Sequence, residues 1–130
     1  MEPTTIELPI VEVTHAEAME KFLMVYLSEH LGVNNPKDSR WFMSDVACGC
    51  LVKASKTVAR IKGTITLKEW RNLGYGEAIL ERLIEEATKA GFQKIEVFSK
   101  YPNWFANNGF TRRRVTSWGV AVMEKNLNGG

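Results

Sequence analysis

The spacing of apolar residues predicts three helices. The first follows a capping-box sequence that begins at Thr14, where apolar residues recur every three or four positions, and we expect it to end at Gly32. A second helix is predicted over residues 77–90 and a short third one over residues 102–108, which begins at a proline. Gly91 and Gly109 end the second and third helices. The apolar stripe of the first helix comprises Met19, Phe22, Leu23, Tyr26 and Leu27, and that of the second comprises Ile79, Leu80, Leu83, Ile84 and Ala87.

The other apolar runs are short and rich in β-branched residues, which is typical of strands. A run of strands favours antiparallel hairpins, whereas a helix between two strands favours a parallel crossover. We therefore predict an α/β (α+β) fold: a mixed, mostly antiparallel twisted sheet of about six to seven strands, with helices on both faces. The predicted strands cover residues 6–13, 41–44, 47–54, 57–67, 94–98, 110–115 and 118–125.

Length and composition narrow the class of protein. A chain of 130 residues, with 45% hydrophobic and 25% charged residues, is predicted to form a single domain over 1–130, with a flexible tail at 126–130. The formal charge of +2 is too small by itself to indicate a nucleic acid or membrane partner. No apolar run approaches the roughly 18 residues of a membrane span, and no export signal is evident, so the expectation is a cytoplasmic protein.

Cys48 and Cys50 form a C-x-C pair in a predicted strand. Their side chains would share one face and lie too close in sequence for an easy disulfide. A metal site would need further ligands, and the histidines, His15 and His30, lie far upstream. We expect two reduced thiols, buried or half-buried, and no metal.

The stretch RNLGYGEAIL, residues 71–80, places two glycines and an arginine at the start of the second long helix. The first amides of a helix lack partners within it, and the helix dipole makes that end partly positive. Glycine lets the backbone approach an anion, and Arg71 adds a formal charge, so the segment suits a phosphate or pyrophosphate. A plain tight turn with a helix cap is the alternative. Because Gly-Lys-Ser/Thr is absent and position 79 is isoleucine, neither a Walker loop nor a dinucleotide fingerprint is present.

Three segments resemble one known family. RNLGYG (71–76) is similar to the R/Q-x-x-G-x-G/A signature of the GCN5-related N-acetyltransferases. WFANNGF (104–110) resembles the family's L-Y-E-K-L-G-F segment, and VAVMEK (120–125) its last strand. The resemblance covers roughly residues 41–127 and implies an acyl-coenzyme A N-acyltransferase fold. The implied function is transfer of an acetyl group from acetyl-CoA to an amine of a small molecule or protein, by a monomer or homodimer.

The resemblance also implies which residues hold acetyl-CoA. The amides of residues 73–77 would bind its pyrophosphate, and the backbone of residues 65–67 would pair with the pantetheine arm as an added strand. A splay between that strand and residues 94–98 would admit the thioester, and a backbone amide near Leu67 would polarise its carbonyl. The expected cofactor-binding residues are Ile65, Thr66, Leu67, Arg71, Asn72, Leu73, Gly74, Tyr75, Gly76, Glu77 and Phe105.

The catalytic residues are less clearly marked. The family's frequent general acid is the tyrosine of L-Y-E-K, and this chain has Phe105 there, which cannot donate a proton. Tyr101, one helical turn earlier, and Ser99 are the substitutes that we predict, although a thiolate is also a tolerable leaving group without an acid. Glu69 is the first candidate for the general base. Glu96 and Asp45 are further candidates, and each of the three carboxylates is alternatively an ordinary surface group.

Residues 112–114 are three consecutive arginines, the densest charge cluster of the chain. In a regular strand Arg112 and Arg114 would share one face and Arg113 the other. The cluster suits a charge-protected edge strand, a grip on an acidic acceptor, or, with Trp41, Trp104 and Trp118, nucleic-acid binding. Two alternatives to the enzyme therefore stay open: a catalytically silent acyl-CoA binding module and a nucleic-acid-modifying protein.

Overall fold

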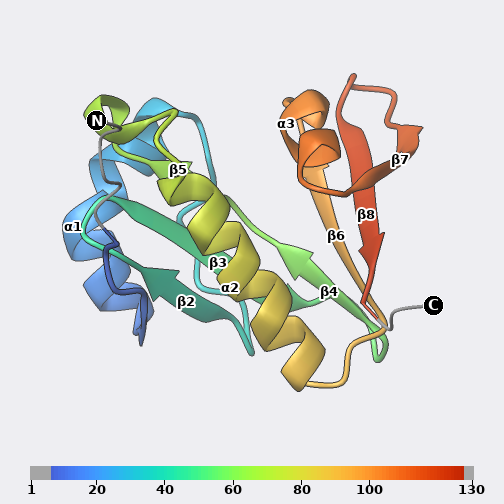
Figure 1. Cartoon of the computed structure of the whole chain (residues 1–130), viewed down its shortest axis with the longest axis horizontal. Helices are drawn as coiled ribbons and strands as arrows, with labels where there is room; N and C mark the ends of the chain where they lie inside the picture. Colours follow the sequence, from blue (N-terminus) through green and yellow to red (C-terminus); the bar gives the residue numbers. More distant parts are fainter. Residues whose placement is uncertain (1–6, 128–130) are drawn as a thin grey trace, which may run out of the picture.

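The computed structural model describes residues 7–127 (Figure 1). Three α-helices, eight strands and one 3-10 turn, η1, follow one another along this part of the chain. In order they are β1 (Val11–Val13), α1 (His15–Ser28), β2 (Arg40–Met43), β3 (Ala47–Lys53), β4 (Val58–Ile61), β5 (Ile65–Thr66), η1 (Lys68–Trp70), α2 (Tyr75–Lys89), β6 (Lys94–Ser99), α3 (Pro102–Asn107), β7 (Thr111–Val115) and β8 (Ala121–Asn126).

All described strands join one mixed sheet, which confirms the predicted fold class. Its order is β1-β2-β3-β4-β6-β8-β7, with β5 paired to β3 off this path. Only β4 and β6 pair in parallel among the described strands, and α2 lies between them in the chain. The sheet has eight strands rather than six to seven because one predicted strand is broken in two.

The break lies in the segment that was predicted as a single strand over residues 57–67. Gly63 has a φ of +80°, a left-handed conformation that interrupts a strand, so β4 ends at Ile61 and β5 begins at Ile65. The hydroxyl of Tyr26, on α1, donates a hydrogen bond of 3.0 Å to the Gly63 carbonyl. The bend is therefore fixed by a residue far away in the sequence, and it directs β5 away from β6.

The start of α1 is as predicted, but its end is not. Thr14 and Glu17 form the capping box, with the Glu17 amide donating to Thr14 Oγ1 at 3.1 Å. The helix ends at Ser28 rather than at Gly32, with Glu29 as its C-cap and His30 in the left-handed region at φ 56°. The Leu31 amide then donates to the Tyr26 carbonyl at 2.9 Å, which closes the last turn.

The boundaries near both ends also differ from the prediction. Of the predicted strand over residues 6–13, only Val11–Val13 is a strand, since Pro9 has no amide proton for a sheet hydrogen bond, and residue 6 lies outside the described residues. At the other end, Asn126 belongs to β8 and the Leu127 amide donates to the Gln93 carbonyl at 2.9 Å. The ordered chain thus extends past the predicted start of the tail, and residues 128–130 lie outside the described part.

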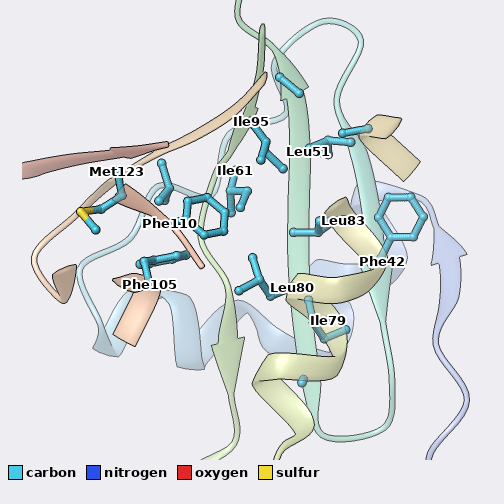
Figure 2. Packing of buried hydrophobic residues seen from close by; sticks show 14 of the residues in the cluster. Phe42, Leu51, Ile61, Ile79, Leu80, Leu83, Ile95, Phe105, Phe110 and Met123 are labelled. Carbon is cyan, nitrogen blue, oxygen red and sulfur yellow. The ribbon is translucent and has the colours of Figure 1, made fainter. Parts of the chain in front are cut away.

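Helices cover both faces of the sheet, as predicted. The α2 face carries the larger apolar cluster, in which Ile79, Leu80 and Leu83 of α2 pack on the strands beside Phe105 and Phe110 (Figure 2). On the opposite face, Phe22 and Tyr26 of α1 pack against Trp41, Cys48, Cys50 and Ile65. Both cysteines are buried free thiols, which confirms their predicted state.

Candidate active site

A cleft of about 380 Å³ opens where β5 has turned away from β6. Residues from the end of α1, from β5, from the turn before α2 and from α3 line it. Figure 1 shows the start of α2 beside β5 on one side and α3 above β6 on the other. The lining residues are Glu29, Leu31, Thr64, Ile65, Thr66, Arg71, Asn72, Gly76, Glu77, Tyr101, Trp104 and Phe105.

The strand pairing explains why this cleft exists. β4 and β6 pair from Val58 with Lys94 to Ile61 with Val97, and β5 then pairs with β3 alone among the described strands. One edge of β5 is consequently left without a strand partner, and this edge faces the cleft.

Thr66 presents its peptide groups at that open edge. The Leu67 amide donates to the Val46 carbonyl at 2.8 Å, toward β3, whereas the Thr66 carbonyl accepts from Arg71 Nε at 3.0 Å, on the cleft side. Because the N–H and C=O of one strand residue point the same way, the Thr66 amide also points toward the cleft. The amide of Leu67 itself is therefore already occupied on the β3 side.

The glycine turn begins α2 without a side-chain cap. Gly74 is the N-cap residue, at φ 92°, and Asn72 is also left-handed, at φ 63°. Gly76 lies in the first turn of the helix, where a Cβ atom would come within 3.1 Å of Thr66 Oγ1 and 3.5 Å of Trp104 Cζ2. The lack of a side chain at Gly76 thus keeps the floor of the cleft open.

Arg71 is held from two sides. Its Nη2 donates to Glu29 Oε1 at 2.8 Å, and its Nε donates to the Thr66 carbonyl. The ion pair is partly exposed, at 42% for Arg71 and 33% for Glu29. This pair links the end of α1 to the turn before α2.

The α3 side of the cleft is aromatic. Trp104 Nε1 donates to Glu77 Oε1 at 3.0 Å, which joins α3 to the first turn of α2. Phe105 is 6% exposed and its ring packs edge-on against Phe110 at 5.4 Å. Tyr101 is 69% exposed at the rim, and its amide donates to Ser99 Oγ at 2.8 Å.

The structure brings together most of the residues expected to bind the cofactor. Seven of them line the cleft: Ile65, Thr66, Arg71, Asn72, Gly76, Glu77 and Phe105. Leu67, Leu73, Gly74 and Tyr75 flank it without lining it; Tyr75 is 8% exposed in the core and Leu73 is 52% exposed.

The candidate catalytic residues are more scattered. Tyr101 lines the cleft, while Ser99 is buried behind it. Glu69 lies on η1 outside the lining residues. Glu96 is buried on the α1 face of the sheet, 3.6 Å from Arg60. Asp45 forms a surface ion pair with Lys21 at 3.2 Å.

Sequence reasoning did not assign four of the lining residues to the site: Glu29, Leu31, Thr64 and Trp104. Thr64 Oγ1 is buried and has no hydrogen-bond partner among the described residues, and it lies at the cleft. The glycine before it, which breaks the strand, was the signal that could have indicated Thr64. For Glu29 no local signal exists, since its partner Arg71 is 42 residues away.

The arginine and tryptophan clusters do not assemble as a stacking surface. Trp41 is 3% exposed in the core under α1, Trp104 lines the cleft, and Trp118 is 89% exposed in the turn before β8. The predicted alternation of the arginines is also wrong, because the register shifts between Arg112 and Arg114. Arg113 meets Glu124 at 3.5 Å.

Within residues 7–127, no group of three or more His, Cys, Asp or Glu side chains is placed to hold a metal ion. Within the same range, no helix combines the length and the apolar character that crossing a membrane requires.

The cleft fits a nucleotide thioester. A helix start with a glycine N-cap can receive a pyrophosphate, the missing Cβ at Gly76 leaves room for it, and an open strand edge can pair with an amide-containing arm. The hydroxyl of Thr64, which has no hydrogen-bond partner within residues 7–127, supplies a further polar group in the cleft.

A mixed sheet that splays beside a glycine turn at a helix start is the architecture of acyl-CoA N-acyltransferases. Residues 20–113 match the Acetyltransferase (GNAT) family, and the chain belongs to that family.

Solved structures share the fold at low sequence identity. An acetyltransferase of the GNAT family from Staphylococcus aureus Mu50 is 16% identical, with a TM-score of 0.73 over 94% of this chain and 100% of that one. Ard1 from Thermoplasma volcanium is 12% identical, with a TM-score of 0.72 over 92% and 97%. N-acetylglutamate synthase from Neisseria gonorrhoeae, complexed with coenzyme A and N-acetyl-glutamate, is 13% identical, with a TM-score of 0.70 over 95% of this chain and 36% of that one. No curated protein matches the sequence.

Proposed function

We propose that this protein is an acetyl-CoA-dependent N-acetyltransferase that acts on an amine of a small molecule or protein. The observation that carries the proposal is the cleft in which the glycine turn of α2 faces the open edge of β5. The coenzyme A complex of the Neisseria gonorrhoeae synthase, which shares the fold, supports it.

The chain would hold acetyl-CoA at two places. The amides at the start of α2, over residues 73–77, together with Arg71 and Asn72, receive the pyrophosphate. The segment from Ile65 to Leu67 lies along the arm with the peptide groups of Thr66 at its open edge, and Phe105 and Trp104 lie opposite. When bound, acetyl-CoA supplies an acyl group activated as a thioester.

The Thr66 amide is the donor that we assign to the pantetheine arm, because the same residue contacts Arg71 and adjoins Gly76 at the pyrophosphate end of the site. It points into the cleft, whereas the Leu67 amide is engaged by Val46. A backbone donor at an open strand edge pairs with an amide carbonyl of the arm, as it would with an added strand.

Two groups in the cleft can move protons. Two carboxylates of residues 7–127 line the cleft, and Glu77 already accepts a hydrogen bond from Trp104. Glu29 is therefore our candidate for accepting a proton from the amine. It becomes free to do so when a phosphate replaces it as the partner of Arg71. Glu69, the first candidate for the general base, does not line the cleft and would have to accept the proton from outside it. The Tyr101 hydroxyl is our candidate for protonating the departing thiolate, with Ser99 positioning its backbone.

Calorimetry with acetyl-CoA, followed by thiol release against a panel of amines, tests the proposal. We expect saturable binding that Arg71→Ala weakens, and turnover with at least one amine. An Arg71→Ala variant that binds as the wild type does would contradict the cofactor site.

A catalytically silent acyl-CoA binding module is the second candidate, and Phe105 favours it. The side chain that stands in place of the family tyrosine is buried against Phe110 and has no proton to donate. Binding without turnover across the amine panel would select this candidate.

A further inference from the structure

One half of the sheet carries no helix on the α1 side among the described residues. The apolar cluster under α1 takes its strand residues from β1, β2, β3 and β5, and none from β6, β7 or β8. On those outer strands and on β4, the side chains of this face follow from the register. Glu96 lies opposite Arg60 and Glu124, and Phe98 lies opposite Val122.

A β-bulge gathers two arginines on this face. Arg112 pairs with Met123, whose side chain belongs to the α2-side core, so Arg112 points to that side. Arg114 pairs with Val122, and Arg113 reaches Glu124 at 3.5 Å, which places both on the opposite side. Three consecutive arginines are thus divided two to one between the faces.

We name this half-sheet surface the cationic face. Its five cations outnumber its two carboxylates by three, whereas the whole chain has a net charge of +2. The carboxylates are already matched: Glu96 with Arg60 at 3.6 Å, and Glu124 with Lys94 and Arg113 at 3.5 Å each. Lys62 and Arg114 form no ion pair with a described carboxylate, so the face as a whole keeps a net positive charge. The residues of the face are Arg60, Lys62, Lys94, Arg113 and Arg114, with Glu96 and Glu124.

The cationic face continues into a hollow of about 270 Å³ that adjoins the cleft. Leu31 lines both spaces, and Gly63, in the hollow, is bonded to Thr64, in the cleft. The hollow therefore places Arg60, Lys62 and Phe98 beside the end of the cleft at Thr64. An acceptor that lies in it can place an amine at the cleft.

We propose that the hollow and the cationic face bind an acidic polypeptide segment that flanks the acceptor amine. This inference rests on the proposed transferase function. The distance across β4, β6, β8 and β7 is about 14 Å at a strand spacing of ~4.8 Å, which an extended peptide of about four residues spans. Carboxylates pair with guanidinium groups by charge-assisted hydrogen bonds, and Arg113 and Arg114 are both exposed.

A single-stranded nucleic acid fits this face less well. Base stacking needs open aromatic rings, and the ring of Phe98, the aromatic side chain of the hollow, already has the Arg60 guanidinium over it at 4.8 Å.

Fluorescence anisotropy with labelled peptides provides the test. The probe is a short peptide with one central lysine flanked by glutamates, and the control peptide has glutamine in place of each glutamate. Free glutamate serves as a competitor. A short labelled single-stranded oligonucleotide is the alternative ligand. The test variant is the double substitution Arg113→Gln and Arg114→Gln. Arg112→Gln is the positional control, because it removes one arginine charge from the same strand on the other face, and it is compared with Arg113→Gln and Arg114→Gln singly as well as with the double variant.

We expect the glutamate peptide to bind more tightly than the glutamine peptide, and the double variant to weaken its binding about fivefold, with the control near wild type. In thiol-release assays the double variant should raise KM for the glutamate peptide and leave kcat unchanged. Equal binding of the two peptides, an equal effect of Arg112→Gln, full competition by free glutamate, or tighter binding of the oligonucleotide would each overturn the inference. A wild-type protein that binds the glutamate peptide but does not bind acetyl-CoA would instead overturn the proposed function alone.

Discussion

Arg71 Nη2 lies 2.8 Å from Glu29 Oε1, so the cation of the glycine turn is already paired with a carboxylate from the end of α1. A phosphate that enters the turn must compete with this carboxylate for the guanidinium. The Thr66 carbonyl holds Arg71 Nε independently at 3.0 Å, so the arginine keeps one fixed contact when Glu29 leaves.

Replacing Glu29 by Gln should therefore have opposite effects on binding and turnover. The affinity for acetyl-CoA, measured by calorimetry, should rise about two- to fivefold because the competing charge of a partly exposed pair is gone. The turnover number should fall at least tenfold if Glu29 accepts the amine proton. A variant whose affinity is unchanged would show that Glu29 does not restrain Arg71.

Gly76→Ala should separate binding from stability. The added methyl group would lie 3.1 Å from Thr66 Oγ1 in the cleft, so we expect the Kd for acetyl-CoA to rise at least tenfold. Alanine is the better helix former by about 1 kcal/mol, so urea unfolding should show a stability that is no lower.

Gly91→Ala is the counterpart. Gly91 has a φ of +88° with nothing near its Cβ position, and it lies beyond the far end of α2. The substitution should cost about 1 kcal/mol of stability through backbone strain and leave the Kd unchanged. If both glycine variants lost affinity equally, the effect at Gly76 would be one of folding.

Two tyrosines allow a matched comparison. Tyr26 is fully buried and donates to the Gly63 carbonyl at 3.0 Å, so Tyr26→Phe should lower the free energy of unfolding by about 1 kcal/mol. Tyr101 is 69% exposed, so Tyr101→Phe should leave stability unchanged and lower the turnover number about tenfold or more if the hydroxyl protonates the thiolate. Chemical unfolding and thiol release measure the two quantities. A Tyr101→Phe variant with wild-type turnover would remove Tyr101 from the mechanism.

Local patterns in the sequence predicted what local chemistry decides. The capping box at Thr14, the apolar stripe of α2, the end of α2 near Gly91 and the glycine turn before α2 depend on neighbours within a few residues, and the structure has them all. The seven predicted cofactor residues that line the cleft were implied by the family resemblance, which itself depends on two local motifs, the glycine turn and the segment around α3.

Contacts between distant residues account for what was missed. The bend at Gly63 is held by Tyr26, 37 residues away, and this bend creates both the eighth strand and the cleft. The Glu29–Arg71 pair spans 42 residues. The bulge in β7 depends on the register with β8, which three consecutive arginines do not encode.

The buried cysteines make stability depend on pH in the alkaline range. Burial raises the pKa of Cys48 to about 11 and that of Cys50 to about 12, where a neighbouring Cys48 charge adds to the effect. In the unfolded chain a thiol ionises near 8.5. Between these values the unfolded state releases protons that the folded state keeps, so the free energy of unfolding must fall as the pH rises.

Because both thiols stay neutral in the folded state, the free energy of unfolding should fall by about 2 kcal/mol between pH 8 and pH 9.5. This range lies below the pH at which unfolded tyrosines ionise. Urea unfolding at several pH values measures this slope. The double variant Cys48→Ala and Cys50→Ala should be less stable at pH 8 but flatter across the same range. A thiol reagent at pH 8 should react with both cysteines in urea and with neither in the native protein, because both side chains are 0% exposed. Rapid labelling of the native protein, or an equal slope in the double variant, would contradict the assignment of the pH dependence to these buried thiols.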